Sequence, residues 1–106
     1  MNIQYKKGVL ELLVLSLLHG RDRYSYEVSE YLSERIDISD GTVYPILRKL
    51  KNDGLVTTYL VEESGGPPRK YYSLTKLGRE SYLADRSDYM NFARTIEAIL
   101  EEQNHE

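Results

Sequence analysis

Hydrophobic residues near the N-terminus recur at helical spacing and cover most of the helix circumference. The pattern predicts a helix from about Lys6 to His19, ending at Gly20, a residue type that commonly terminates helices. Its main stripe and the apolar residues on its other sides are Leu10, Leu13, Val14, Leu17 and Leu18, then Val9, Leu12 and Leu15. A helix that is apolar nearly all round must be buried on more than one side. In a short chain, this predicts contact with a second subunit as well as with the core.

Two shorter helices are predicted after the polar turn at residues 20–23. Ser25 is the expected N-cap of the second helix, because its hydroxyl can accept a hydrogen bond from an unpaired backbone N–H. Ser39 is the expected N-cap of the third helix, and Gly54 is expected to end it. The apolar residues at helical spacing are Val28, Tyr31, Leu32 and Ile36 in the second helix, and Val43, Ile46, Leu47 and Leu50 in the third.

Pro45 falls beyond the first turn of this predicted third helix. There a proline removes one hydrogen bond, and its ring presses against the carbonyl four residues earlier. That earlier residue is Gly41, whose backbone can shift most easily. We therefore expect an adjustment at Gly41 to accommodate the proline.

The second half of the chain predicts a β-hairpin followed by one long helix. Strands are expected from Leu55 to Val61 and from Arg69 to Leu74, since both segments are rich in β-branched or tyrosine residues. The Gly- and Pro-rich segment 62–68 between them is a loop by its turn residues. Thr75 is the expected N-cap of the last helix.

This order of elements predicts an α+β, mainly α fold: a winged helix-turn-helix of three helices plus a β-hairpin wing, with a long C-terminal dimerisation helix. Residues 1–75 are expected to form the DNA-binding part and residues 76–106 the dimerisation helix of the same compact fold. The length of 106 residues suits one domain, and a domain this small gains stability from a partner subunit.

Charge is distributed unevenly along the chain, whose formal net charge is −3. Residues 35–79 carry 8 basic and 5 acidic groups, whereas residues 80–106 carry 2 basic and 7 acidic groups. A basic middle and an acidic end are typical of a nucleic-acid reader with a separate assembly segment, although a short chain can also segregate charge by chance.

Composition argues against other classes of protein. Cysteine is absent, which excludes disulfides and thiolate metal sites and suits a cytoplasmic location. The longest apolar run, from Val9 to Leu18, is too short to span a membrane and lacks a signal-peptide cleavage site. The two histidines, His19 and His105, show no pairing with a nucleophile, and no phosphate loop is visible. Acid pairs such as Glu62-Glu63 are expected to be solvated. We therefore expect no enzyme activity and no cofactor or metal.

Three motifs occur in order along the chain. The stretch Gly41-Thr42-Val43-Tyr44-Pro45-Ile46-Leu47-Arg48-Lys49-Leu50, followed by Asp53-Gly54-Leu55-Val56, resembles the recognition helix of the PadR family of transcriptional regulators. The wing motif is Gly66-Pro67-Pro68-Arg69-Lys70-Tyr71-Tyr72-Ser73-Leu74-Thr75, and the second-helix start is Tyr24-Ser25-Tyr26-Glu27-Val28. Their order and spacing make the resemblance specific, and the single C-terminal helix is similar to compact, multidrug-sensing members.

The resemblance implies a DNA-binding repressor whose third helix reads the major groove of an inverted-repeat operator. The residues expected to contact DNA are Tyr26, Ser39, Thr42, Tyr44, Pro45, Arg48, Lys49, Arg69 and Lys70. Hydroxyls and lysines would hold phosphates, while Thr42, Tyr44 or Arg48 would reach base edges. Arg69 and Lys70 would grip the backbone or enter the minor groove. Alternatively these are solvated surface groups, with Tyr26 or Tyr44 partly buried.

The last helix is expected to form a homodimer, packing against the first helix of the other chain. Drug-sensing relatives bind planar aromatic compounds between subunits, stacked on a tryptophan whose place Tyr89 takes here. The expected ligand residues are Leu13, Tyr89, Met90, Phe92, Ala93 and Ile96, which equally fit the core of a dimer interface. The alternative function is a winged helix that binds protein without binding DNA.

Overall fold

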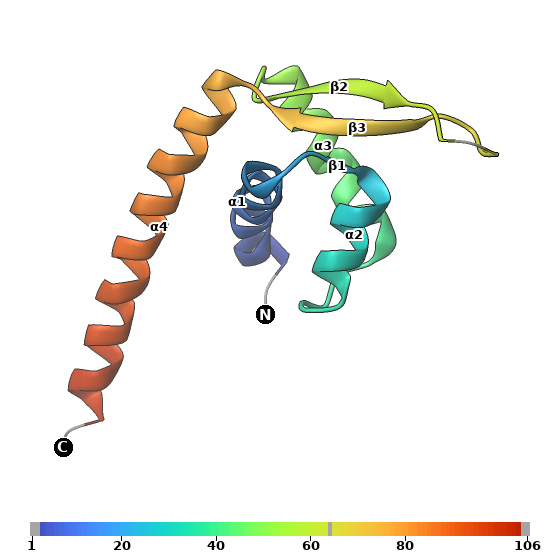
Figure 1. Cartoon of the computed structure of the whole chain (residues 1–106). Helices are drawn as coiled ribbons and strands as arrows, with labels where there is room; N and C mark the ends of the chain where they lie inside the picture. The colour runs from blue at the N-terminus through green and yellow to red at the C-terminus, as the bar shows by residue number, and fades with distance from the viewer. Residues whose placement is uncertain (1–2, 64, 105–106) are drawn as a thin grey trace.

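The computed structural model describes residues 3–63 and 65–104 and has the predicted order of elements (Figure 1). The helices and strands are α1 (Ile3–Gly20), β1 (Arg23–Tyr24), α2 (Ser25–Ser33), the 3₁₀ turn η1 (Asp40–Thr42), α3 (Val43–Asn52), β2 (Val56–Val61), β3 (Arg69–Leu74) and α4 (Lys76–Gln103). Helices α1 to α3, with the hairpin of β2 and β3 as the wing, form a winged helix-turn-helix. The prediction of an α+β, mainly α fold is confirmed.

The first two helices differ from their predicted bounds. Helix α1 begins at Ile3 rather than near Lys6. Gly20 is the last residue of α1 rather than the residue after it. Helix α2 ends at Ser33, so Ile36 lies in the following turn, where its N–H donates to the Leu32 carbonyl and its side chain still packs against the core.

The N-cap of α2 is Tyr24 rather than the predicted Ser25, which is the first helical residue. Tyr24 has the extended conformation of an N-cap, with φ −90° and ψ 160°. The Glu27 carboxylate accepts a hydrogen bond from the Tyr24 N–H at 3.4 Å, as in one half of a capping box. The Arg21 guanidinium in turn lies 2.8 Å from the Glu27 carboxylate. The side chain that accepts a backbone hydrogen bond at the start of α2 is thus the Glu27 carboxylate, where the sequence predicted the Ser25 hydroxyl.

The recognition helix also starts differently from its prediction. Ser39 caps η1, and α3 itself begins at Val43. Pro45 is therefore the third residue of α3, inside the first turn, where backbone N–H groups have no intrahelical partner. A proline is tolerated in the first turn of a helix, and Gly41 lies in the 3₁₀ turn η1 that directly precedes α3.

Gly54 ends α3 as predicted. Its φ of +76° is the left-handed conformation that favours glycine after a helix. The Leu55 N–H bonds to the Leu50 carbonyl at 2.9 Å, and the Gly54 N–H bonds to the Lys51 carbonyl at 3.0 Å. These two bonds form a Schellman motif, which turns the chain sharply into β2.

The sheet contains a short strand that the sequence did not predict. Strand β1 pairs antiparallel with β3, which gives the strand order β1-β3-β2. Its two residues are too few to show an alternating pattern, and its partner lies far along the chain. The pairing aligns Tyr24 with Tyr71, and Tyr71 with Tyr59, so that three tyrosines form a row across the sheet.

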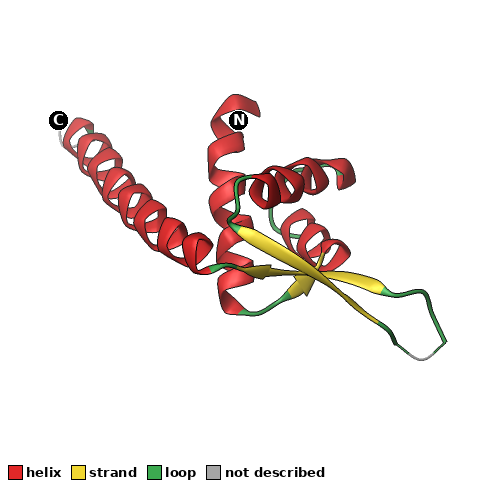
Figure 2. Cartoon of the chain, turned by 90° about the horizontal axis from the view of Figure 1, so that it is seen from above, coloured by secondary structure: helices red, strands yellow, loops and turns green. Residues whose placement is uncertain are grey.

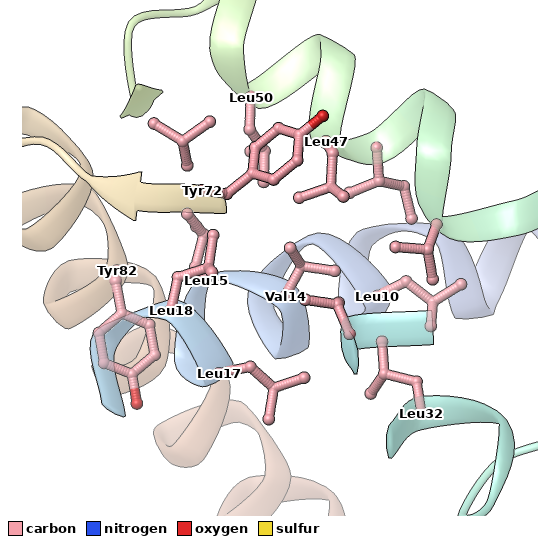
Figure 3. Close-up of a cluster of buried hydrophobic side chains, with 14 residues drawn as sticks. Leu10, Val14, Leu15, Leu17, Leu18, Leu32, Leu47, Leu50, Tyr72 and Tyr82 are labelled. Carbon is pink, nitrogen blue, oxygen red and sulfur yellow. The ribbon is translucent and has the colours of Figure 1, made fainter. Parts of the chain in front are cut away.

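The core lies where α1, α2, α3 and β3 meet (Figure 3). It contains the predicted stripes of α1 and α3, with Val28 and Leu32 from α2. Tyr72 enters it from β3 and Tyr82 from α4. Val14 and Leu47 are completely buried. The largely apolar helix α1 lies between α4 on one side and the two other helices on the other (Figures 1 and 2).

Helix α4 contacts the body of the molecule mainly through its first turns. Thr75 caps it as predicted, accepting from the Gly78 N–H at 3.0 Å. Gly78 and Tyr82 are its only buried residues among those described. From there α4 runs away from the body, opposite to the direction in which the wing extends (Figure 2). No helix within 3–63 and 65–104 is long and apolar enough to cross a membrane.

Gly78 permits this close approach, and we expect Gly78→Ala to destabilise the fold by about 1–3 kcal/mol. An added Cβ would overlap the Leu55 carbonyl oxygen and lie 3.1 Å from Leu74 Cδ2. This clash outweighs the roughly 1 kcal/mol that alanine gains over glycine within a helix. The matched control is Gly41→Ala, where a Cβ meets nothing within 4 Å and stability should hold or rise slightly. Thermal unfolding of both variants checks this, and a Gly78→Ala protein as stable as wild type would contradict it.

Candidate nucleic-acid interface

The amphipathic pattern of α3 determines which of its side chains can meet a ligand. Val43, Ile46, Leu47 and Leu50 are buried, as predicted. The residues between them are exposed on the opposite side, namely Tyr44, Pro45, Arg48 and Lys49. The exposed fraction of Tyr44 is 53%, so the ring is about half exposed, which fits both a DNA contact and the partly buried aromatic of the alternative interpretation. The side of α3 opposite the core therefore presents the Tyr44 ring and the cations of Arg48 and Lys49 to solvent.

Two further hydroxyls meet just before α3. The Ser39 and Thr42 hydroxyl oxygens lie 2.9 Å apart across η1, joined by one hydrogen bond. Ser39 is exposed and Thr42 is half-buried. Each hydroxyl has capacity for another hydrogen bond, so the pair can still bind a phosphate or a base edge.

Tyr72 links strand β3 to the buried side of the recognition helix. It lies in the same buried cluster as Leu47 and Leu50 of α3 (Figure 3). Burial raises the pKa of its phenol, the Tyr44 phenol adds to the effect, and the Arg48 guanidinium opposes it.

Lys49 differs from Arg48 because carboxylates already surround it. Its ammonium lies 3.2 Å from the Asp53 carboxylate and 3.4 Å from that of Glu11 on α1. The hydrogen bond to Asp53 and the neighbouring Glu11 raise the pKa of Lys49. Sequence reasoning missed the Glu11 contact, because the two residues lie far apart in the chain.

The pleat of β3 separates the two basic residues of the wing. Arg69 shares a face with Tyr71, whereas Lys70 shares the other face with Tyr72, which points into the core. The Arg69 guanidinium lies 4.7 Å from the ring centroid of Tyr24. It also pairs with Glu63 at 3.7 Å, and both Glu62 and Glu63 are exposed, as expected of a solvated acid pair.

The start of α2 adds a second aromatic side chain beside α3. Tyr26 is 63% exposed and stacks on Tyr24 at 6.2 Å between ring centroids. A groove of about 310 Å³ separates Tyr26 from Tyr44. Its floor and walls contain Ser25, Ser29, Glu30, Ser33 and Val43. Ser25 and Ser29 lie one helical turn apart, a hydroxyl spacing that the sequence analysis did not single out.

The structure brings the predicted DNA residues to α3, the start of α2 and the wing, on the side of α1 away from α4 (Figures 1 and 2). The sequence of residues 14–84 matches the model of the PadR-like family of transcriptional regulators. The chain belongs to this family. Its members are regulators of transcription and not enzymes, and they bind DNA, typically as dimers.

Solved structures of family members superimpose over nearly the whole chain. A PadR-like transcription factor from Bacteroides fragilis is 37% identical, with a TM-score of 0.76, covering 91% of this chain and 94% of its own. A Streptococcus transcriptional regulator is 34% identical, with a TM-score of 0.84 and coverages of 92% and 98%. A PadR-like regulator from Bacillus cereus is 31% identical, with a TM-score of 0.83 and coverages of 92% and 96%.

A second groove of this PadR-like chain lies between α1 and α4. Its volume is about 350 Å³, and its lining includes Tyr89 and Phe92 from the predicted ligand set. The other lining residues are Gly8, Val9, Glu11, Leu12, Leu15, Leu50, Leu55 and Asp85. Leu13, Met90, Ala93 and Ile96 are not among them. The groove is thus apolar and aromatic, with two carboxylates, Glu11 and Asp85, at its wall.

Proposed function

We propose that this PadR-like regulator is a dimeric repressor that binds an inverted-repeat operator. The exposed face of α3, with the exposed start of α2 beside it, carries this proposal. A major groove admits one helix, and Tyr44 and Arg48 are the side chains on α3 with the reach and donors to read base edges. Ser39, Thr42, Tyr26 and the wing residues would contact the sugar-phosphate backbone on either side.

The apolar stripe of α4 supports the dimer. Phe92 is 60% exposed in the single chain, and Tyr89, Met90, Ile99 and Leu100 are also exposed along this helix. Exposed apolar side chains in such number on one helix are typical of an interface. A second copy of the chain, packing its α1 and α4 against them, would cover this stripe. In this division of roles, residues 1–75 bind DNA and residues 76–106 dimerise.

A small aromatic ligand is the proposed inducer. The groove between α1 and α4 has the size and the apolar, aromatic lining of a small-molecule site. Its Glu11 and Asp85 carboxylates favour a compound with a positive charge. Because both walls belong to the proposed dimer helices, occupancy would alter the angle between subunits and release the DNA. Operator binding that is equally tight with and without a bound ligand would contradict this mechanism.

Selection from a random duplex library tests the proposed DNA binding. We expect the protein to enrich one sequence with two inverted half-sites, about 34–36 Å apart along the helix axis. Substituting Arg48 should then relax the preference at one position in each half-site. Enrichment of no sequence would instead favour a winged helix that binds protein.

Within this function, Glu11→Gln should strengthen DNA binding about twofold to fivefold at low salt. The substitution removes one of the two carboxylates beside Lys49, so the ammonium becomes available to a phosphate. Glu97→Gln on α4 is the matched control, because it removes the same charge far from α3. Fluorescence anisotropy on the selected duplex measures both variants. Equal affinities for the two would show that Glu11 does not restrain Lys49.

A further inference from the structure

Arg69 of the wing rests on an aromatic ring rather than extending freely into solvent. Its guanidinium lies 4.7 Å from the Tyr24 ring centroid, within the range of a cation–π contact. Its other partner, the Glu63 carboxylate, lies at 3.7 Å, beyond hydrogen-bonding distance. Both members of that ion pair are about half exposed, so solvent screens their attraction. The ring is therefore the more durable of the two partners.

The Tyr24 ring is itself fixed by its surroundings. It lies between Tyr71, at 5.7 Å, and Tyr26, at 6.2 Å between ring centroids. Its backbone is held by the pairing of β1 with β3 and by the hydrogen bond to Glu27. A guanidinium on a rigid platform loses less conformational entropy when it binds a ligand.

We propose that Tyr24 is a positioning residue that holds Arg69 in place to bind a DNA backbone phosphate at the junction of the wing and α2. A ring face engages the plane of the guanidinium but uses none of its N–H groups, which stay available for a bidentate phosphate contact. A phosphate would displace the screened Glu63 carboxylate. Tyr26, stacked on the same ring and exposed at the start of α2, would lie beside that phosphate. The inference rests on the proposed DNA binding.

Lys70 provides an internal control. It is adjacent to Arg69 and carries the same charge, but the pleat directs it to the opposite face of β3. Tyr24 should therefore influence Arg69 without influencing Lys70. Double-mutant cycles on Tyr24 with Arg69 and on Tyr24 with Lys70 distinguish positioning of Arg69 from a general structural effect.

The test measures affinity for the selected operator duplex by anisotropy over a salt series. Tyr24→Leu should weaken binding about fivefold to thirtyfold, because each of the two subunits loses an exposed cation–π contact of about 0.5–1 kcal/mol. The loss should be the same in a Lys70→Met background and absent in an Arg69→Met background. Tyr24→Phe keeps the ring face and should bind within about twofold of wild type. Arg69→Met should reduce the salt slope by about 1.8, the value for two phosphates, because each subunit of the dimer loses one contact.

Additive losses for Tyr24→Leu and Arg69→Met would overturn the positioning role while leaving DNA binding intact. A Tyr24→Phe protein that binds the operator as weakly as Tyr24→Leu would also overturn the positioning role. If Tyr24→Leu fails to fold, the positioning role is tested by NMR on wild-type protein, through the ring-current shift of the Arg69 side-chain protons. A shift that persists on addition of the duplex supports the inference, and its loss overturns it. Wild-type protein that binds no duplex would refute the proposed function itself, and this inference with it.

Discussion

Phe92→Glu should convert the dimer into a monomer and weaken operator binding at least a hundredfold. The ring is 60% exposed in the single chain, so its replacement leaves the fold of each subunit intact. In the dimer the same ring would be covered, and burial of a phenylalanine contributes about 1.5–3 kcal/mol. An unpaired buried carboxylate adds a larger cost, and two-fold symmetry applies both penalties twice. Each 1.4 kcal/mol is a tenfold change in affinity.

Operator binding is weakened because the DNA-binding parts of the two subunits are no longer joined in one dimer. A dimer binds its second half-site at high effective concentration, an advantage of about 10²–10⁴ that a monomer lacks. Sedimentation equilibrium and anisotropy measure the two effects separately. Ser87→Glu adds the same charge on another side of α4, since a five-residue offset turns the helix well away from Phe92. Ser87→Glu should remain dimeric, and a dimeric Phe92→Glu would contradict the proposed interface.

Leu47→Ala should lower the free energy of unfolding by about 2–5 kcal/mol. Leu47 is completely buried on the core side of the recognition helix α3, in the cluster where α1, α2, α3 and β3 meet (Figure 3). Removing three carbons there loses contacts and leaves a cavity that close-packed neighbours fill only in part. Small domains have only about 5–15 kcal/mol of stability in total, so the change is a large fraction. Urea unfolding should show a lower midpoint with an unchanged slope.

The neighbouring residue should behave in the opposite way. Arg48 is exposed, so Arg48→Ala should change stability by no more than about 0.5 kcal/mol. It should instead reduce discrimination between operator and non-operator DNA about tenfold or more. If Arg48→Ala proved unstable, or Leu47→Ala as stable as wild type, then the assignment of buried and exposed faces of α3 would be wrong.

These faces could be read from the sequence because they depend on local periodicity. The buried stripe of α3 and the cap at Thr75 need only the spacing of apolar residues and one hydroxyl before a helix. The motifs at α3 and the wing identified the family for the same reason, since their spacing is local. The start of α3 was misjudged because Ser39 also caps a 3₁₀ turn, and the two kinds of cap look alike in sequence.

Contacts between distant segments could not be predicted. Strand β1 is recognisable only through its pairing with β3, and the Arg69 contact with Tyr24 depends on that pairing. The Glu11 contact with Lys49 depends on how α1 crosses α3. The groove between α1 and α4 likewise contains residues of both helices that no spacing rule connects. In contrast, the separation of Arg69 from Lys70 follows from strand alternation and could have been inferred.

Sequence-selective DNA binding is measured by fluorescence anisotropy on the selected operator and on a scrambled duplex. Over a salt series, we expect the protein to bind the operator at least about a thousandfold more tightly than the scrambled duplex. Titration at saturation should give two chains per operator. Equal, weak binding to both duplexes, or no binding at low salt, would contradict sequence-selective DNA binding.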